Sequence, residues 1–298
     1  VRPNPTANFY ANTICEGDTT FFTDTSTIIA PLGGIITGWN WSMTDPGEGT
    51  YINGTSSTSR NPDFIYHNDG TYNVTLTVTD SNGCTDDTTI LITVDPGPIA
   101  NFSATTVCEG DSTLFTDSST ILPLGGIITN WDWDFGDNNP STDTNPTHLY
   151  AQAGIYNVTL TVTDTNGCIG DTTIIVTVDT LPIANFSATD TCQGDSTSFT
   201  NLSIGTSAII TNWNWDFGDN NTSTDTNPTH LYDTAGSYNV TLEVTDSNGC
   251  IHDTTITVIV RPNPTANFYA NTICEGDTTF FTDTSTIIAP LGGIITGW

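Results

Sequence analysis

The chain has 298 residues, of which 36% are hydrophobic and 10% aromatic, enough for two or three domains with packed cores. It carries 33 acidic residues against three arginines and no lysine, a formal net charge of −30. Because nucleic acids and anionic membrane surfaces are bound through basic side chains, this balance argues against both classes of partner. No stretch approaches the roughly 20 apolar residues of a membrane span.

An internal repeat organises the chain. The phrase Ala-Asn-Phe recurs with its phenylalanine at positions 9, 102, 186 and 268. Residues 260–298 are identical to residues 1–39, so the sequence begins again after 259 residues. We expect units at 1–97, 98–181 and 182–260, and a truncated fourth at 261–298 that repeats the first. The position 1 residue is not an initiator methionine, and we expect a window of a longer periodic chain; three units with a redundant tail is the alternative.

Each unit consists of short segments in which apolar and polar residues alternate, the pattern of a β-strand with one buried face. In chain order, the clearest are 72–78, 131–135, 156–162, 174–178 and 238–244. The pair Asn166-Gly167 between two of them tolerates the positive φ of a tight hairpin turn. About seven short strands in 80–90 residues predict an all-β fold of tandem Ig-like β-sandwich domains arranged end to end.

The joints between units are short and carry proline, at 95–98, 179–182 and 260–264. Because proline restricts the backbone, we expect neighbouring units to follow one another semi-rigidly. At about 3.3 Å per strand residue a sandwich is roughly 35–40 Å long, so three units in line would span roughly 100–130 Å.

Four motifs recur in the second and third units. They are W-[DN]-W-D-F-G-D (131–137, 213–219), N-P-T-H-L-Y (145–150, 227–232), a G-x-Y-N-V-T-L strand (154–160, 236–242) and N-G-C (166–168, 248–250). This combination resembles the polycystic kidney disease (PKD) domain family, in its cysteine-containing form from large bacterial surface proteins, over essentially the whole chain. The resemblance implies Ig-like sandwiches that are not catalytic and act as spacers, stalks or adhesive modules. The first unit departs, with W-N-W-S-M at 39–43 and about ten extra residues before Tyr66.

Each complete unit has one cysteine in a C-[EQ]-G-D phrase and one after Asn-Gly. An even number of cysteines per secreted unit predicts one disulfide in each, pairing Cys15–Cys84, Cys108–Cys168 and Cys192–Cys250. Bonds between units and free thiols are the alternatives. Cys274 is the seventh, and its partner would lie beyond residue 298. The absence of a C-x-x-C spacing argues against a metal site at the cysteines.

The acidic turns of the second and third units offer weak calcium candidates at Asp134, Asp137, Asp216 and Asp219. The competing interpretation is that Asp137 holds its turn by accepting hydrogen bonds from nearby backbone N–H groups. The loss of this turn in the first unit speaks against a site that every unit needs. No other cofactor is expected.

Asp-Thr/Ser-Thr phrases recur at two places in each unit and are similar to an O-glycosylation consensus of some Gram-negative bacteria. The candidate acceptors are Thr19, Thr88, Ser112, Thr172, Ser196, Thr254 and Thr278. The alternative is that threonine simply suits exposed strand positions.

An apolar segment with few charges, 28–36, recurs at 121–128 and in shortened form at 203–210. It precedes the tryptophan-bearing strand of each unit. It is interpreted either as a buried loop or as a lateral contact between chains.

The four histidines lack the converging nucleophile and acid that a catalytic triad needs, so we expect no enzyme. The leading hypothesis is a structural subunit of an extracellular filament, secreted to a bacterial cell surface, whose partners are copies of itself and covalently attached glycans. The second is the stalk of a large surface adhesin. The third, a carbohydrate-binding accessory module, is disfavoured because Trp131, Trp133 and Phe135 alternate in phase toward the core.

Overall fold

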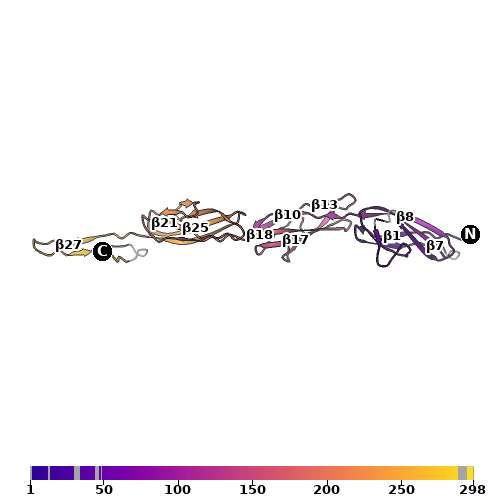
Figure 1. The fold of residues 1–298 in the computed structure, drawn as a ribbon, viewed down its shortest axis with the longest axis horizontal. Helices are drawn as coiled ribbons and strands as arrows, with labels where there is room; N and C mark the ends of the chain where they lie inside the picture. The colour runs from indigo at the N-terminus through magenta and orange to yellow at the C-terminus, as the bar shows by residue number, and fades with distance from the viewer. Residues whose placement is uncertain are drawn as a thin grey trace. The chain divides into compact units, whose positions relative to one another are not determined.

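The computed structural model describes residues 2–12, 14–29, 34–43, 47, 49–287 and 294–297. These residues form strands and turns and no helix (Figure 1), which confirms the all-β prediction. Accordingly, none of the described residues belongs to a helix long and apolar enough to cross a bilayer. They cluster into two compact units, one made of 1–105, 112–149 and 155–176, the other of 106–111, 150–154 and 177–298.

The first domain is a sandwich of two four-stranded sheets. One sheet has the order β1-β3-β6-β5 and the other β2-β8-β7-β4. The strands are β1 (Phe9–Ala11), β2 (Ile14–Cys15), β3 (Thr19–Asp24), β4 (Ile36–Met43), β5 (Gly49–Tyr51), β6 (Asp63–Tyr66), β7 (Gly70–Asp80) and β8 (Thr85–Asp95). β7 and β8 form the long antiparallel hairpin that the alternation of residues 72–78 predicts.

Aromatic residues fill the space between the two sheets of the first domain. The Trp41 ring lies 5.0 Å from Phe9 and 5.3 Å from Phe22 between ring centroids. Val74 and Leu76 of β7 are fully buried beneath them. From Tyr72 onward every second residue of β7 is buried, which is the period of a strand and not of a helix.

The second and third domains repeat this pattern. The second has β9 (Pro98–Ile99), β10 (Phe102–Ala104), β11 (Val107–Cys108), β12 (Ser112–Asp117), β13 (Thr120–Ile121), β14 (Ile128–Asp134), β15 (Pro140–Ser141), β16 (Thr147–Leu149), β17 (Gly154–Asp164) and β18 (Ile169–Asp179). The third has β19 (Phe186–Ala188), β20 (Thr191–Cys192), β21 (Ser196–Asn201), β22 (Ile210–Asp216), β23 (Thr222–Ser223), β24 (Thr229–Leu231), β25 (Gly236–Asp246) and β26 (Ile251–Arg261).

Equivalent sheets recur in these two domains, in the orders β10-β12-β16 with β11-β18-β17-β14-β15 and β19-β21-β24 with β20-β26-β25-β22-β23. Trp133 and Phe135 are buried, as their phase predicted, and Trp131 on the same face is half-buried. β27 (Phe268–Ala270) pairs with β28 (Phe281–Asp283) in the register that β1 keeps with β3, as expected for a repeat of the first domain.

The divergent stretch of the first domain changes one strand pairing. β5 pairs with β6 in the first domain, whereas β15 and β23 pair with the tryptophan strands β14 and β22. Met43 stands where Phe135 stands in the second domain, and its sulfur accepts a hydrogen bond from Tyr66 Oη at 3.6 Å.

Candidate functional site at the joints between domains

Each domain carries its two cysteines at opposite ends. We call the end where the chain enters the entry end and the end where the last long strand stops the exit end. In the first domain Cys84 precedes β8 at the entry end, where Ala7 N donates to Asp86 Oδ2 at 2.8 Å. Cys15 lies at the exit end, because β2 runs parallel to β8 with Cys15 opposite Asp95.

The predicted disulfides within domains are therefore wrong. Eleven residues of β8 separate the level of Cys84 from that of Cys15, which at about 3.3 Å per residue is over 30 Å. A disulfide requires Cα atoms about 4.4–6.8 Å apart. The structure instead joins neighbouring domains through Cys15–Cys168, with a Cα–Cα distance of 5.5 Å, and Cys108–Cys250, with 5.6 Å. The remaining cysteines, Cys84, Cys192 and Cys274, are in no disulfide among the described residues.

Hydrogen bonds reinforce the first joint beside its disulfide. Asp95, only 3% exposed, accepts a bond from Gly97 N at 2.9 Å and one from the side-chain amide of Asn166. Gly97 has a φ of 72°, and a side-chain carbon there would touch Cys168 Cβ at 3.6 Å. The proline-bearing joint is thus held by a turn, a carboxylate and a covalent bond.

The turn of the second domain that reaches this joint is built around Asp164. Its Oδ1 accepts bonds from Asn166 N and Cys168 N, both at 2.9 Å, and its Oδ2 accepts one from Gly126 N at 3.1 Å. Asp95, Asp164 and Cys168 approach closely enough to share a metal ion. However, Cys168 is bonded to Cys15, and both carboxylates already accept hydrogen bonds, so this group is accounted for as the polar part of the joint.

The second joint has the same construction. β11 lies parallel to the end of β18 with Cys108 opposite Asp179, and Glu109 N donates to Asp179 O at 2.7 Å. Opposite Cys108, Asp246 Oδ1 accepts bonds from Asn248 N and Cys250 N at 2.9 Å. Equivalent turns and equivalent cysteines therefore meet at both joints.

The weak calcium candidates lie in the acidic turns, as predicted, and their geometry is that of turn-holding groups. Asp134 Oδ1 accepts a bond from Gly136 N at 2.9 Å, and Asp137 Oδ1 accepts one from Asn139 N at 3.1 Å. Asp137 Oδ2 also pairs with His148 Nε2 at 2.8 Å. Asp216, Asp219 and His230 repeat these contacts in the third domain. Burial opposes ionisation of Asp137, but the bonds from His148 and Asn139 outweigh it and lower the pKa of this carboxyl.

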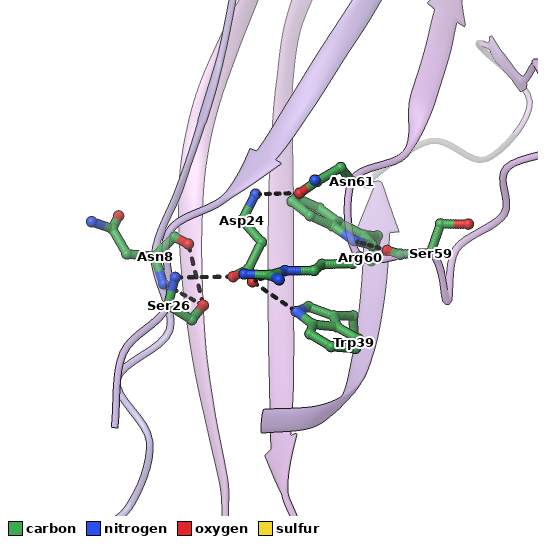
Figure 2. A network of polar contacts seen from close by, with 8 residues as sticks. Asn8, Asp24, Ser26, Trp39, Ser59, Arg60 and Asn61 are labelled. Atoms are coloured by element: carbon green, nitrogen blue, oxygen red, sulfur yellow. Dashed lines mark hydrogen bonds and ion pairs between the residues drawn. The ribbon is translucent and has the colours of Figure 1, made fainter. Parts of the chain in front are cut away.

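A polar network at the edge of the first core was not expected from the sequence (Figure 2). The Asp24 carboxylate accepts bonds from Trp39 Nε1 at 2.9 Å and from Arg60 Nε at 3.1 Å, and the guanidinium lies 5.6 Å from the Trp39 ring. Burial disfavours the charged carboxylate, but the bonds from Ser26, Trp39 and Arg60 together lower the pKa of Asp24. No local motif announces this network, because its members come from three separate segments.

The glycosylation candidates remain accessible. Ser112, Ser196 and Thr278 are exposed, and Thr19, Thr88, Thr172 and Thr254 are half-buried. Whether they carry glycans stays a prediction.

The apolar segments are not the buried loops that one interpretation expected. Ile35, Ile127 and Ile209 occupy equivalent positions before the tryptophan strands and are 71%, 73% and 74% exposed. Residues 30–33 of the first segment lie outside the described residues.

Comparison with known proteins places these domains in a family. A family model described as PKD domain matches residues 2–94, 95–178 and 179–260. A microbial collagenase of Vibrio alginolyticus is 44% identical over 79 residues, 24% of this chain and 10% of that protein. The pre-pro-metalloprotease PrtV of Vibrio cholerae serotype O1 is 32% identical over 167 residues, 55% of this chain and 17% of that protein. The chain thus spans less than a fifth of the length of these curated relatives.

Two solved domains are also similar. The crystal structure of the PKD1 domain of Vibrio cholerae PrtV is 38% identical, with a TM-score of 0.26, and covers 27% of this chain and 96% of that domain. The PKD1 domain of Vibrio anguillarum Epp is 32% identical, with a TM-score of 0.27, over 29% of this chain and 98% of that domain. The family model, in contrast, matches three consecutive ranges that together exceed half of the sequence. The chain therefore belongs to the PKD domain family, with three members in tandem.

Proposed function

We propose that this chain is a structural subunit of an extracellular filament or fibre built from a periodic three-domain PKD repeat. The observation that carries the proposal is the disulfide pattern, since each bond joins one domain to the next instead of closing a single domain. A bond inside a domain stabilises that domain alone. A bond across a joint limits rotation between neighbours and transmits tension, which is the property a load-bearing polymer needs.

The sequence period supports the same interpretation. Residues 260–298 repeat residues 1–39 without a single difference, so one three-domain block serves as the unit of a longer array. The net charge of −30 keeps such an array soluble and limits random association through like-charge repulsion. Structural disulfides form and persist in oxidising compartments, which supports an extracellular location, the cell surface included.

The exposed isoleucines supply a candidate for lateral association between copies. Ile35, Ile127 and Ile209 recur once per domain at equivalent positions, each more than two-thirds exposed. Isolated exposed apolar residues are common, but one at the equivalent position of every domain offers each domain the same contact to a neighbouring copy.

The second candidate is the stalk of a large surface adhesin, in which a single chain carries a binding domain at its tip. The stiffened joints favour this function as well, because a stalk must also hold its tip away from the surface. The two differ in lateral order: a stalk stands alone, whereas a fibre packs copies side by side or winds them into a uniform strand.

Electron microscopy of the native material separates the two. The fibre predicts strands of uniform diameter, and the triple variant Ile35→Ser, Ile127→Ser, Ile209→Ser should lose that lateral order. Leu91→Ser with Ile175→Ser is a matched control, since these residues are 60% and 67% exposed on long strands away from the tryptophan strand. Isolated flexible beaded chains in both the native and the variant material would contradict the fibre and support the stalk.

A further inference from the structure

We propose that Cys192 and Cys84 form a third interdomain disulfide, which joins one three-domain repeat to the next. In this bond Cys192 pairs with the residue equivalent to Cys84 in the domain that residues 260–298 begin, the next repeat of the same chain. The inference rests on the periodic chain of the proposed function. Its starting point is that Cys84 and Cys192 lie at the entry end of the first domain and the exit end of the third, and neither is in a disulfide.

The Cys192 half of the bond is already built in the third domain. β20 runs parallel to the end of β26 with Cys192 opposite Arg261, and Gln193 N donates to Arg261 O at 2.8 Å. The two bonded exit ends have the same arrangement, with Cys15 opposite Asp95 and Cys108 opposite Asp179, and with Glu16 N–Asp95 O at 2.8 Å and Glu109 N–Asp179 O at 2.7 Å. Cys192 therefore has the same strand register and the same neighbouring backbone hydrogen bond as the two exit cysteines that are in disulfides.

The Cys84 half is equally complete. Asp80 Oδ1 accepts bonds from Asn82 N and Cys84 N, both at 2.8 Å, and Gly83 between them has a φ of 86°. The bonded turns at the other entry ends keep these contacts through Asp164 and Asp246, with Gly167 at 86° and Gly249 at 89°. Cys84 thus occupies the same turn geometry as Cys168 and Cys250.

A hydrogen bond within the first domain indicates how the Cys192 half and the Cys84 half meet. Arg2 is the counterpart of Arg261, because residues 1–39 and 260–298 are identical. The guanidinium Nη1 of Arg2 donates to Asn82 Oδ1 on the turn that carries Cys84. At the first joint the equivalent Asn166 bonds Asp95, the residue beside Cys15.

Asp95 and Arg2 thus occupy the same position, the one opposite an exit cysteine. Each of them bonds the asparagine of a turn that carries an entry cysteine. Since Arg261 lies opposite Cys192, an Arg261 placed as Arg2 is placed brings Cys192 to the turn of the next Cys84. The arginine donates to the asparagine carbonyl oxygen where, at the first joint, the asparagine amide donates to the aspartate. The asparagine accommodates both, because its side chain has a donor and an acceptor.

The bond forms by thiol–disulfide exchange with a disulfide-bearing oxidoreductase or small disulfide of the extracellular side. The thiolate of one cysteine attacks a sulfur of the donor disulfide, forming a mixed disulfide and releasing one donor thiolate. The second cysteine then attacks the mixed disulfide at the protein sulfur and releases the other donor thiolate. Two cysteine thiols lose two protons and two electrons, and the donor disulfide gains both to become a dithiol.

Disulfide mapping of the native, full-length protein tests the inference. Unreduced material is alkylated to mark free thiols, cut with pepsin at acid pH, where exchange is suppressed, and analysed by mass spectrometry. The sequences around the three exit cysteines (T-I-C-E-G-D, T-V-C-E-G-D, D-T-C-Q-G-D) and the three entry cysteines (N-G-C-T-D-D, N-G-C-I-G-D, N-G-C-I-H-D) all differ, so each joint has its own linked peptide. Cys15–Cys168 and Cys108–Cys250 serve as internal references.

We expect D-T-C-Q-G-D linked to N-G-C-T-D-D at an abundance comparable to the two references, and no loss of chain mass on reduction. Alkylated Cys84 and Cys192, or either one linked within its own domain, would overturn the proposal. The expected link accompanied by a fall to short subunits on reduction would overturn the same-chain assignment. Filament imaging is independent of this result, because a fibre can exist without the third disulfide and a solitary stalk can contain it.

Discussion

A single substitution distinguishes the polar edge of the third core from that of the others. Asp24 and Asp117 each accept a bond from a tryptophan Nε1, at 2.9 and 3.0 Å. Asn201 takes this position in the third domain, and its Oδ1 already accepts a bond from Ser203 N at 3.0 Å. Only a donor amide remains, and the Nε1 of Trp213 is buried without a partner.

Asn201→Asp should therefore stabilise the third domain by about 1–2 kcal/mol, because a carboxylate supplies the missing acceptor for Trp213. The matched control, Asp117→Asn, should destabilise the second domain by a similar amount by removing the partner of Trp131. Urea unfolding followed by tryptophan fluorescence measures both. Shifts of the same sign for the two variants, or no shift in either, would show that the tryptophan bond does not matter.

Asp24 gives the fold a defined sensitivity to acid. Its pKa is lowered in the folded state, so its contribution is present above the unfolded value of about 3.9 and is lost as pH falls through the lower folded pKa. Asp24→Asn should unfold more easily than the parent chain at pH 7, and this difference should shrink below about pH 4. Urea titrations between pH 7 and 3 test it, and a difference that stays constant with pH would contradict the assignment.

At the scale of elements, the strands were predictable from the sequence and the disulfide pairing was not. Alternation over 72–78 and the Asn-Gly turns follow from local chemistry, which residue spacing records directly. The pairing depends instead on β2 lying parallel to the far end of β8, a contact between segments about 80 residues apart. Two cysteines per domain fit a bond within the domain equally well until that register is known.

Removing the first interdomain disulfide should lower the free energy of unfolding of the 298-residue chain. Cys15 and Cys168 are 153 residues apart, and removing such a cross-link typically costs about 2–4 kcal/mol. Cys15→Ser with Cys168→Ser should lower the urea midpoint accordingly, whereas Cys84→Ser should change the free energy of unfolding by less than about 0.5 kcal/mol. A loss of about 2 kcal/mol or more from Cys84→Ser alone would favour the pairing of Cys15 with Cys84.

At the scale of the whole molecule, the scarcity of cations makes the chain a poor substrate for trypsin. Arg2 and Arg261 both precede proline, which leaves Arg60 as the one ordinary cleavage position among the three arginines. The Arg60 side chain is 63% exposed, but it bonds Asp24 and lies over Trp39, so it must leave both contacts to enter a protease pocket. Native material should stay intact in trypsin, and Asp24→Asn should speed cleavage after Arg60 several-fold. Rapid cleavage of the folded parent chain at this position would contradict the network.

The interdomain disulfides and the sequence period belong to the same block of three domains. Two joints are locked by disulfides, and the 259-residue period repeats the block that contains them. If the block is the unit of a fibre, the fibre must carry the period along its axis. With sandwiches roughly 35–40 Å long, three domains in line give about 100–130 Å, and a shorter axial rise if the domains tilt.

The most direct test is electron microscopy of the native material with an axial power spectrum. We predict uniform filaments whose spectrum contains one sharp layer-line repeat, at or below about 130 Å. After mild reduction of the disulfides, this repeat should persist only in filaments whose strands are held together by lateral contacts. Flexible beaded chains with no axial periodicity would contradict the claim that this PKD array is itself a building material.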